Sequence, residues 1–338
     1  KPVDEPIKPA IGTPITYPVD KKTDNRSAFG KALADIGKTN RNGTPVVVFD
    51  CDLKPSTKVN EFEKVWPENF IQIGVQEHNA AVVAGAASVC GTLSFFADFG
   101  VFGIDETYNQ QRLNDINKAN VKVAVTHVGI DVGEDGKTHH CLDYIGALRN
   151  FFGFGLIVPA DPNQTDRAVR YMSQTQGNCV IAMGRSTMNP IADEKGGPFF
   201  GDSYKYEYGK IDVIRKGKGI TLLSTGQVTH QAVLAADQLK KDGLEVTVLN
   251  LSAPLASDLD SARDYLVGTV ITLEDHNVNT GLASIVEEYF VREGFLPEKF
   301  VKIGVDRYMY SGDNEKLYDL VGLSRDSIVE KVREILRQ

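Results

Sequence analysis

The chain has 338 residues, of which 42% are hydrophobic and 24% charged, and its formal net charge is −8. This length suits two α/β domains, and the composition is ordinary for a globular protein. The acidic balance argues against nucleic acid or an anionic membrane as a partner, and no apolar run approaches the roughly 20 residues that span a bilayer.

The N-terminal stretch is rich in proline and shows no apolar period, which predicts a linker or N-terminal extension over residues 1–23. From residue 24 the pattern alternates between helices and short apolar strands. We expect helices at 26–36, 77–89, 144–152 and 164–174, and strands at 45–49, 122–127, 156–158 and 179–183. Strands that are apolar throughout are typical of a parallel sheet covered on both faces. The pattern predicts a first α/β domain over residues 24–192.

A turn-rich stretch at residues 189–202 indicates a domain boundary. A second alternation follows it, with strands at 219–224, 245–249, 270–274 and 300–305 and helices at 227–240, 282–291 and 325–336. We expect a second domain over residues 203–338. The predicted fold class is therefore α/β, with two doubly wound domains and a mostly parallel sheet in the first.

Polar residues follow several predicted strands of the first domain. Asp50 and Asp52 end the first strand, His127 and a glycine-rich loop over 129–136 follow another, and Arg185 follows the last. Ligands of open α/β sheets bind beyond the carboxyl ends of the strands. The sequence therefore predicts one shared site in the first domain.

The glycine-rich loop contains GKT at 136–138, which resembles the end of a phosphate-binding P-loop. A P-loop needs another glycine five residues earlier, where this chain has Asp131. The adjacent His139 and His140 would point in different directions, which makes a metal site improbable. We expect this loop to bind the hydroxyls of a polar ligand.

Three motifs together resemble the transketolase family. The run GEDGKTHH at 133–140 is similar to its GEDGxTH loop, and IGVQEH at 73–78 resembles the motif whose glutamate faces the aminopyrimidine of thiamine. The run FADFGVF at 96–102 is similar to the aromatic cluster around that pyrimidine. The resemblance extends from about residue 24 to the C-terminus and implies a pyrimidine-binding domain followed by a transketolase C-terminal domain.

The resemblance implies thiamine diphosphate as the cofactor. Glu77 would hydrogen-bond the pyrimidine ring nitrogen, and the cofactor would supply the carbon nucleophile. Glu77 and His139 are thus the predicted catalytic residues, and the residues predicted to contact the cofactor besides Glu77 are Phe96, Phe99, Phe102 and Asp52. The phenylalanines recur every third residue, which would also fit the core face of a helix.

The resemblance also implies a sugar phosphate as the substrate. Its phosphate would be bound by Arg26, Ser56, His127 and Arg185, and its hydroxyls by Asp135 and His139. The arginine fork suits a phosphate dianion. Gln76, His140 and Phe102 stand where the family often has arginine, glutamine and tyrosine, and these departures bear on substrate preference.

The Gly-Asp-Gly motif of the diphosphate-binding half of such enzymes does not occur in this sequence. We therefore expect no metal site in this chain, and Mg²⁺ (or Ca²⁺) held by an N-terminal diphosphate-binding partner subunit. Both domains would contribute to a homodimer within a heterotetramer. Glu274, Asp275 and His276 are expected to be structural. Whether the chain is a natural subunit or a fragment of a longer protein stays open.

The predicted function is that of the C-terminal component of a transketolase of the pentose phosphate pathway, which moves a two-carbon ketol unit from a ketose phosphate to an aldose phosphate. One alternative is the β-subunit of a 2-oxoacid dehydrogenase E1, or a half that resembles deoxyxylulose-phosphate synthase. Against E1 stand the GEDGKTH loop and the phosphate-binding residues, which decarboxylation of a 2-oxo acid does not need. The other alternative is a non-catalytic assembly or regulatory homologue, which would tolerate the loss of Glu77.

The four cysteines, Cys51, Cys90, Cys141 and Cys179, are scattered without a CxxC pair. This spacing favours reduced thiols over a disulfide framework or a zinc site. We expect a cytoplasmic location.

Overall fold

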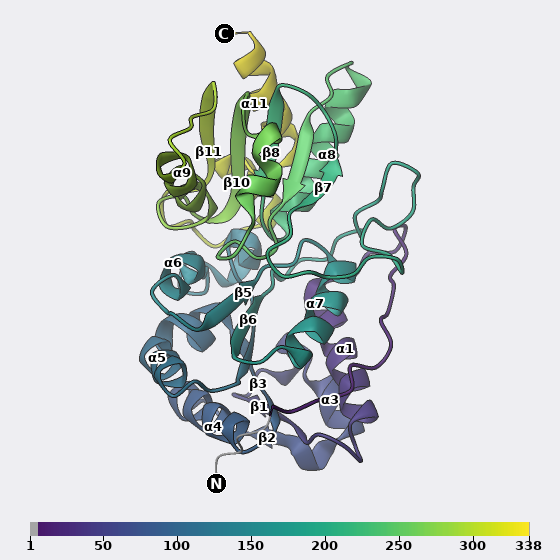
Figure 1. Cartoon of the computed structure of the whole chain (residues 1–338), viewed down its shortest axis with the longest axis vertical. Coiled ribbons are helices and arrows are strands. Elements are labelled where there is room, and N and C mark those ends of the chain that lie inside the picture. The colour runs from purple at the N-terminus through teal and green to yellow at the C-terminus, as the bar shows by residue number, and fades with distance from the viewer. Residues whose placement is uncertain (1–5, 338) are drawn as a thin grey trace.

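The computed structural model describes residues 6–337 and contains two α/β domains, one above the other in Figure 1. The first sheet has the strand order β2-β1-β3-β4-β6-β5, and every neighbouring pair is parallel. Its strands are β1 (Val46–Asp50), β2 (Phe70–Gln72), β3 (Leu93–Phe99), β4 (Lys122–Thr126), β5 (Phe154–Ile157) and β6 (Asn178–Ala182). Because these strands are almost wholly apolar, both faces of the sheet must be covered.

Helices cover both faces of this first sheet (Figure 1). One apolar cluster joins the sheet to the helices on one side, and a second cluster joins it to those on the other. The first side carries α1 (Asn25–Thr39), α3 (Asn60–Val65) and α7 (Pro162–Gln174), and the second side carries α4 (Glu77–Val89), α5 (Tyr108–Ile116) and α6 (Tyr144–Leu148). A short helix α2 (Lys54–Thr57) follows β1.

The second sheet has the order β11-β10-β8-β9-β7, in which only the edge strand β7 is antiparallel. Its strands are β7 (Asp212–Arg215), β8 (Ile220–Ser224), β9 (Thr247–Asn250), β10 (Thr269–Asn277) and β11 (Lys299–Val305). Separate apolar clusters again lie on the two faces. The helices are α8 (Val228–Lys241), α9 (Leu282–Arg292), α10 (Asn314–Val321) and α11 (Arg325–Leu336). The predicted α/β class with two domains is confirmed.

The phenylalanine run does not form the face of a helix. Leu93–Phe99 is strand β3, and a π-helical segment η2 follows it over Val101–Glu106. Strand β3 was missed because Ser94 and Asp98 interrupt its apolar run, and phenylalanines at a spacing of three also fit a helix.

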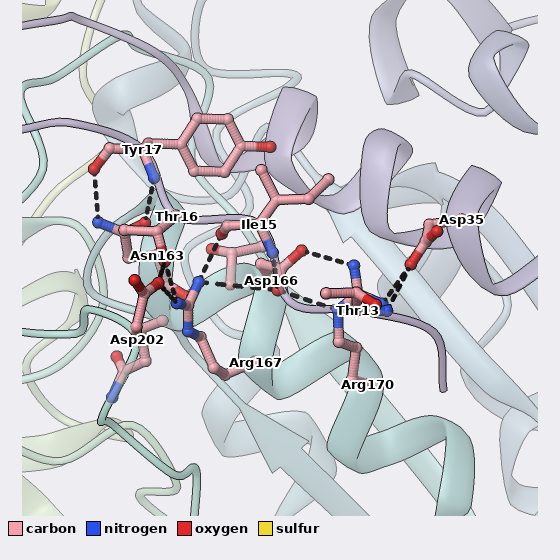
Figure 2. A network of polar contacts seen from close by, with 12 residues as sticks. Thr13, Ile15, Thr16, Tyr17, Asp35, Asn163, Asp166, Arg167, Arg170 and Asp202 are labelled. Atoms are coloured by element: carbon pink, nitrogen blue, oxygen red, sulfur yellow. Dashed lines mark hydrogen bonds and ion pairs between the residues drawn. The ribbon is translucent and has the colours of Figure 1, made fainter. Parts of the chain in front are cut away.

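The N-terminal segment has no helix or long strand among its described residues, yet it is not a free linker. It runs along α1 and α7 and is held by the side chains shown in Figure 2. The amide group of Asn163 exchanges two hydrogen bonds with the backbone of Tyr17, at 2.7 and 3.0 Å. The backbone N–H groups of Thr13 and Ile15 donate to Asp35 and Asp166. Hydrogen bonds to the backbone thus hold residues 11–17 against the first domain, although the composition predicted a linker. We call residues 11–17 the strap.

No helix in the described part of the chain is both long and apolar enough to cross a bilayer.

Candidate functional site

The carboxyl ends of β1, β3, β4 and β6 lie next to one another in the first sheet, and they carry most of the predicted site residues. Asp52 follows β1 and His127 follows β4, with φ angles of 65° and 57° respectively. Positive φ is unusual for residues other than glycine and tends to occur where function requires a particular backbone geometry. The strand order thus brings together segments that are far apart in the sequence.

Glu77, the first residue of α4, is buried beside two further polar side chains. A carboxylate oxygen of Glu77, the Sγ atom of Cys51 and a carboxylate oxygen of Asp98 all lie within 4.8 Å of one another. Burial, with a smaller contribution from Glu77, raises the pKa of Asp98 to about 8, so this carboxyl is mostly protonated at neutral pH. Among the residues that the structure describes, the Oδ2 atom of Asp98 has no hydrogen-bond partner. A carboxyl group that is mostly protonated at neutral pH therefore lies beside Glu77 at the end of β3.

Two phenylalanine rings and two imidazoles contact one another beyond the ends of β3 and β4. The ring of Phe99 stacks on His127 with centroids 3.8 Å apart, and Phe102 lies 6.1 Å from Phe99. The ring of His139 makes T-shaped contacts with Phe99 and Phe102, and its centroid lies 6.4 and 5.6 Å from theirs. Burial, together with the positive charges of Arg26 and Arg185, lowers the pKa of His127 to about 3. His127 is therefore a neutral imidazole that can accept or donate a hydrogen bond.

Phe96 was also predicted to contact the cofactor, and this stays a prediction. Its side chain is fully buried in the apolar cluster between the sheet and the helices. Residues three apart on a strand point to opposite faces, so the side chains of Phe96 and Phe99 leave β3 on different sides. The contacts of Phe96, Phe99 and Phe102 with the cofactor all stay predictions.

Arg26 and Arg185 line a cavity of about 180 Å³ between the two domains. The Nη2 of Arg26 donates to the carbonyl of Arg185 at 2.8 Å, and its Nη1 donates to the carbonyl of Ser56 at 3.1 Å. Arg185 donates from Nη1 to the carbonyl of Val132 at 2.9 Å. Each guanidinium keeps further N–H groups for a ligand, so the pair can bind an oxyanion such as a phosphate.

The same cavity contains carboxylates, which would oppose an anion. Asp131 accepts the N–H groups of Arg185 and Ser186, at 2.5 and 2.8 Å. Asp313 caps α10 and accepts two N–H groups of its first turn. Two of these acids are thus bonded to backbone donors, while Glu134 is exposed to solvent and lies 3.9 Å from Arg185.

The remaining predicted residues lie around these groups. Asp52 is exposed, and its N–H donates to the side chain of Gln72 at 2.9 Å. Ser56 is half-buried and meets Arg26 through its carbonyl oxygen. Asp135 is exposed on the glycine-rich loop. The phosphate-binding, hydroxyl-binding and cofactor-binding residues thus stay predictions, although the structure gathers most of them at one edge of the sheet.

Sequence reasoning missed several residues of this site. Among them, Asp98 offered a signal, because it is the one acid within the apolar run LSFFADF. The sequence gives no signal that joins the other three, which are Asp131, Ser186 and Asn314. Asn314 lies in the second domain, and its Nδ2 donates to Ser186 Oγ at 2.7 Å and to Asp131 at 3.3 Å. The second domain therefore contributes to the wall of the cavity.

Two family models match this chain. The pyrimidine-binding domain of transketolase matches residues 21–190, and the transketolase C-terminal domain matches residues 209–328. Among solved structures, a split-gene transketolase in the form of an inactive β4 tetramer is 30% identical, with a TM-score of 0.79, over 92% of this chain and 97% of the other.

Curated relatives agree with these matches. A putative transketolase C-terminal section from Methanocaldococcus jannaschii is 29% identical over 93% of this chain and 96% of its own length. The transketolase of Mus musculus is 29% identical over 96% of this chain but only 51% of its own length. The chain therefore spans about half the length of the longer relatives and nearly all of the archaeal one.

Proposed function

Because this chain belongs to the transketolase family, we propose that it is the C-terminal component of a thiamine-diphosphate-dependent transketolase. With a diphosphate-binding partner it would transfer a two-carbon ketol unit from a ketose phosphate to an aldose phosphate. The proposal rests on one observation. Glu77 with its polar neighbours, the rings of Phe99 and Phe102, and the pair Arg26 and Arg185 all lie at the carboxyl ends of the strands of the first sheet. This combination suits a flat, polar-edged cofactor beside a phosphorylated substrate.

The residues around Glu77 fit the pyrimidine of thiamine diphosphate. The carboxyl group of Glu77 would hydrogen-bond a nitrogen of the pyrimidine ring, and beside it Asp98 offers a buried oxygen that has no partner within residues 6–337. The half-buried ring of Phe102 and the ring of Phe99 offer an aromatic face. When bound, the cofactor supplies the carbon nucleophile that carries the two-carbon unit. Glu77 would hold the proton at the ring nitrogen.

The half-buried His139 and Asp135 would orient the sugar hydroxyls near the reacting carbon. Arg26 and Arg185 would bind the phosphate at the far end of the substrate, together with Ser56 and the neutral His127. Ligand binding at both ends fixes the position of the reacting bond, which is a large part of what an enzyme contributes.

A partner is proposed for the open side of the site. Near Glu77, the segment from β2 into α4 leaves apolar side chains exposed, namely Ile71, Val75, Val82 and Val83, and Val75 is 75% exposed. Exposed apolar side chains that cluster in this way are typical of surfaces that another chain covers. We infer that this face meets another subunit in a heterotetramer, where the partner half holds the diphosphate and Mg²⁺ (or Ca²⁺). A cytoplasmic location and a place in the pentose phosphate pathway are parts of the same proposal.

The test is reconstitution. The chain is mixed with a transketolase subunit that carries the Gly-Asp-Gly motif, together with thiamine diphosphate and Mg²⁺, and xylulose-5-phosphate and ribose-5-phosphate are supplied. We expect ketol transfer from the mixture and none from either subunit alone. Decarboxylation of pyruvate without ketol transfer would instead indicate an E1 β-subunit. A stable complex without either reaction would indicate an assembly or regulatory homologue.

A further inference from the structure

Three consecutive polar residues at the end of β10, in the second domain, make three different connections. Glu274 stays within its own domain and accepts the N–H groups of the first two residues of α9, at 2.6 and 2.9 Å. His276 crosses to the first domain, where its Nε2 accepts the N–H of Ile145 in α6 at 3.0 Å. Asp275 also crosses to the first domain, and it contacts the glycine-rich loop.

The carboxylate of Asp275 is bonded to the backbone of this loop. Its Oδ1 accepts the N–H of Ile130 at 2.7 Å, and its Oδ2 accepts the N–H of Asp131 at 3.0 Å. The hydroxyl of Tyr318, also from the second domain, donates to Oδ2 at 2.9 Å. These three donors address both oxygens of one side chain and fix its position against the loop.

The contact is too close for any side chain on the preceding residue. Gly129 has a φ of 78°, and a Cβ atom there would lie 2.2 Å from Oδ2 of Asp275. Both the backbone conformation and the approach of the carboxylate thus require glycine. The start of the loop and the second domain form one closely packed unit.

The position of the loop is passed on to Arg185 through Asp131. The side chain of Asp131 accepts the backbone N–H groups of Arg185 and Ser186 at the end of β6. The guanidinium of Arg185 in turn donates to the carbonyl of Val132 in the same loop. A shift of the loop would therefore move both the backbone and the guanidinium of Arg185.

From these contacts we infer that Asp275 is a positioning residue for the sugar-phosphate end of the active site. It holds residues 130–131, and through Asp131 it sets where Arg185 presents its guanidinium to the cavity. The inference rests on the proposed function and extends it, because it assigns to the second domain a part in substrate binding. Asp275 itself does not line the cavity that Arg26 and Arg185 share.

The experiment compares Asp275→Asn with Glu274→Gln in the reconstituted enzyme. Each change replaces one carboxylate that accepts two backbone N–H groups, but only the first pair of N–H groups belongs to the loop. We expect Asp275→Asn to raise KM for the ketose phosphate about tenfold while kcat changes less, since small misplacement of a binding group is costly. Glu274→Gln should lower the melting temperature without changing KM. An unchanged KM in Asp275→Asn, or an equal rise in both variants, would overturn the inference.

A second measurement does not depend on activity. Inorganic phosphate is titrated into the complete chain, with ³¹P resonances as the readout, and hydrogen exchange is followed in residues 129–136. Asp275→Asn should weaken phosphate binding and speed exchange in this segment, whereas Glu274→Gln should do neither. If the wild-type mixture shows no ketol transfer, the proposed function fails, but these two readouts still decide whether Asp275 positions an anion site. Phosphate binding that is equal in both variants would refute that role.

Discussion

Arg170 belongs to the network that holds the N-terminal strap and lies at the end of it nearest Asp35 (Figure 2). Its side chain is 2% exposed, and its Nε and Nη2 each donate to one oxygen of Asp166 at 3.0 Å. Its Nη1 donates to Asp35 at 2.6 Å and also to a carbonyl of the strap. Asp166 is fully buried, so this pair must be considered as a buried ion pair.

Arg170→Met keeps the aliphatic stem and removes the charge. Breaking a buried pair by removing one partner costs about 3–5 kcal/mol, because the other charge stays buried. Asp166 would still accept the N–H of Ile15 and would still lie 3.7 Å from Arg167. Asp35 is a third exposed and can be solvated. We therefore expect the lower end of the range, about 3 kcal/mol of unfolding free energy.

The assay is urea unfolding at pH 7, followed by fluorescence. The chain has a single tryptophan, Trp66, which packs against the core of the first domain, so the signal reports on the domain that carries the network. Arg333→Met is the matched control. Arg333 also contacts two carboxylates, those of Glu330 and Asp242, but its side chain is 35% exposed, and we expect a loss below about 1 kcal/mol.

The penalty in Arg170→Met should depend on pH. Burial already raises the pKa of Asp166, and Arg170 opposes this, so the variant carboxyl should have a still higher pKa. A folded-state pKa above the unfolded value makes stability fall as pH rises, so the penalty should shrink between pH 7 and pH 5. A loss of less than 1 kcal/mol at pH 7, or one equal to that of Arg333→Met, would refute the reasoning.

Three further outcomes follow from the site. Glu77→Gln should abolish ketol transfer in the reconstituted enzyme while the unfolding midpoint of the chain changes little, and residual turnover above about one hundredth of wild type would contradict its role. Arg185→Ala should raise KM for phosphorylated sugars roughly tenfold or more and change kcat less, and an unchanged KM would show that the phosphate lies elsewhere. Asp98→Asn should flatten the pH dependence of stability: the raised pKa of about 8 means that wild-type stability falls as pH rises from about 4 to 8, and the variant lacks this contribution. Melting temperatures at pH 5 and pH 8 would check this, and an identical difference in both proteins would count against a protonated Asp98.

Much of the fold was predictable because its signals are local. Strand β4 and the helix α4 lie within one residue of their expected bounds, since short apolar runs and an alanine-rich stretch mark them directly. Strand β3 was missed because Ser94 and Asp98 interrupt its apolar run, and because three phenylalanines at a spacing of three also fit a helix. The strap was misjudged because its partners are side chains of α1 and α7, which the segment itself does not reveal.

The site divides in the same way. Glu77, His127, His139 and the arginines belong to motifs whose spacing along the chain is visible in the sequence, together with the family that they indicate. The residues that hydrogen-bond these groups or their loops cannot be found from spacing, because they lie in distant segments of the chain. Asp275 meets the loop at Ile130 across 145 residues, and Asn314 meets Ser186 across 128. Local periodicity and residue chemistry thus specify the elements and the reacting groups, whereas only the packing of one domain on the other selects which distant side chains hold those groups in place.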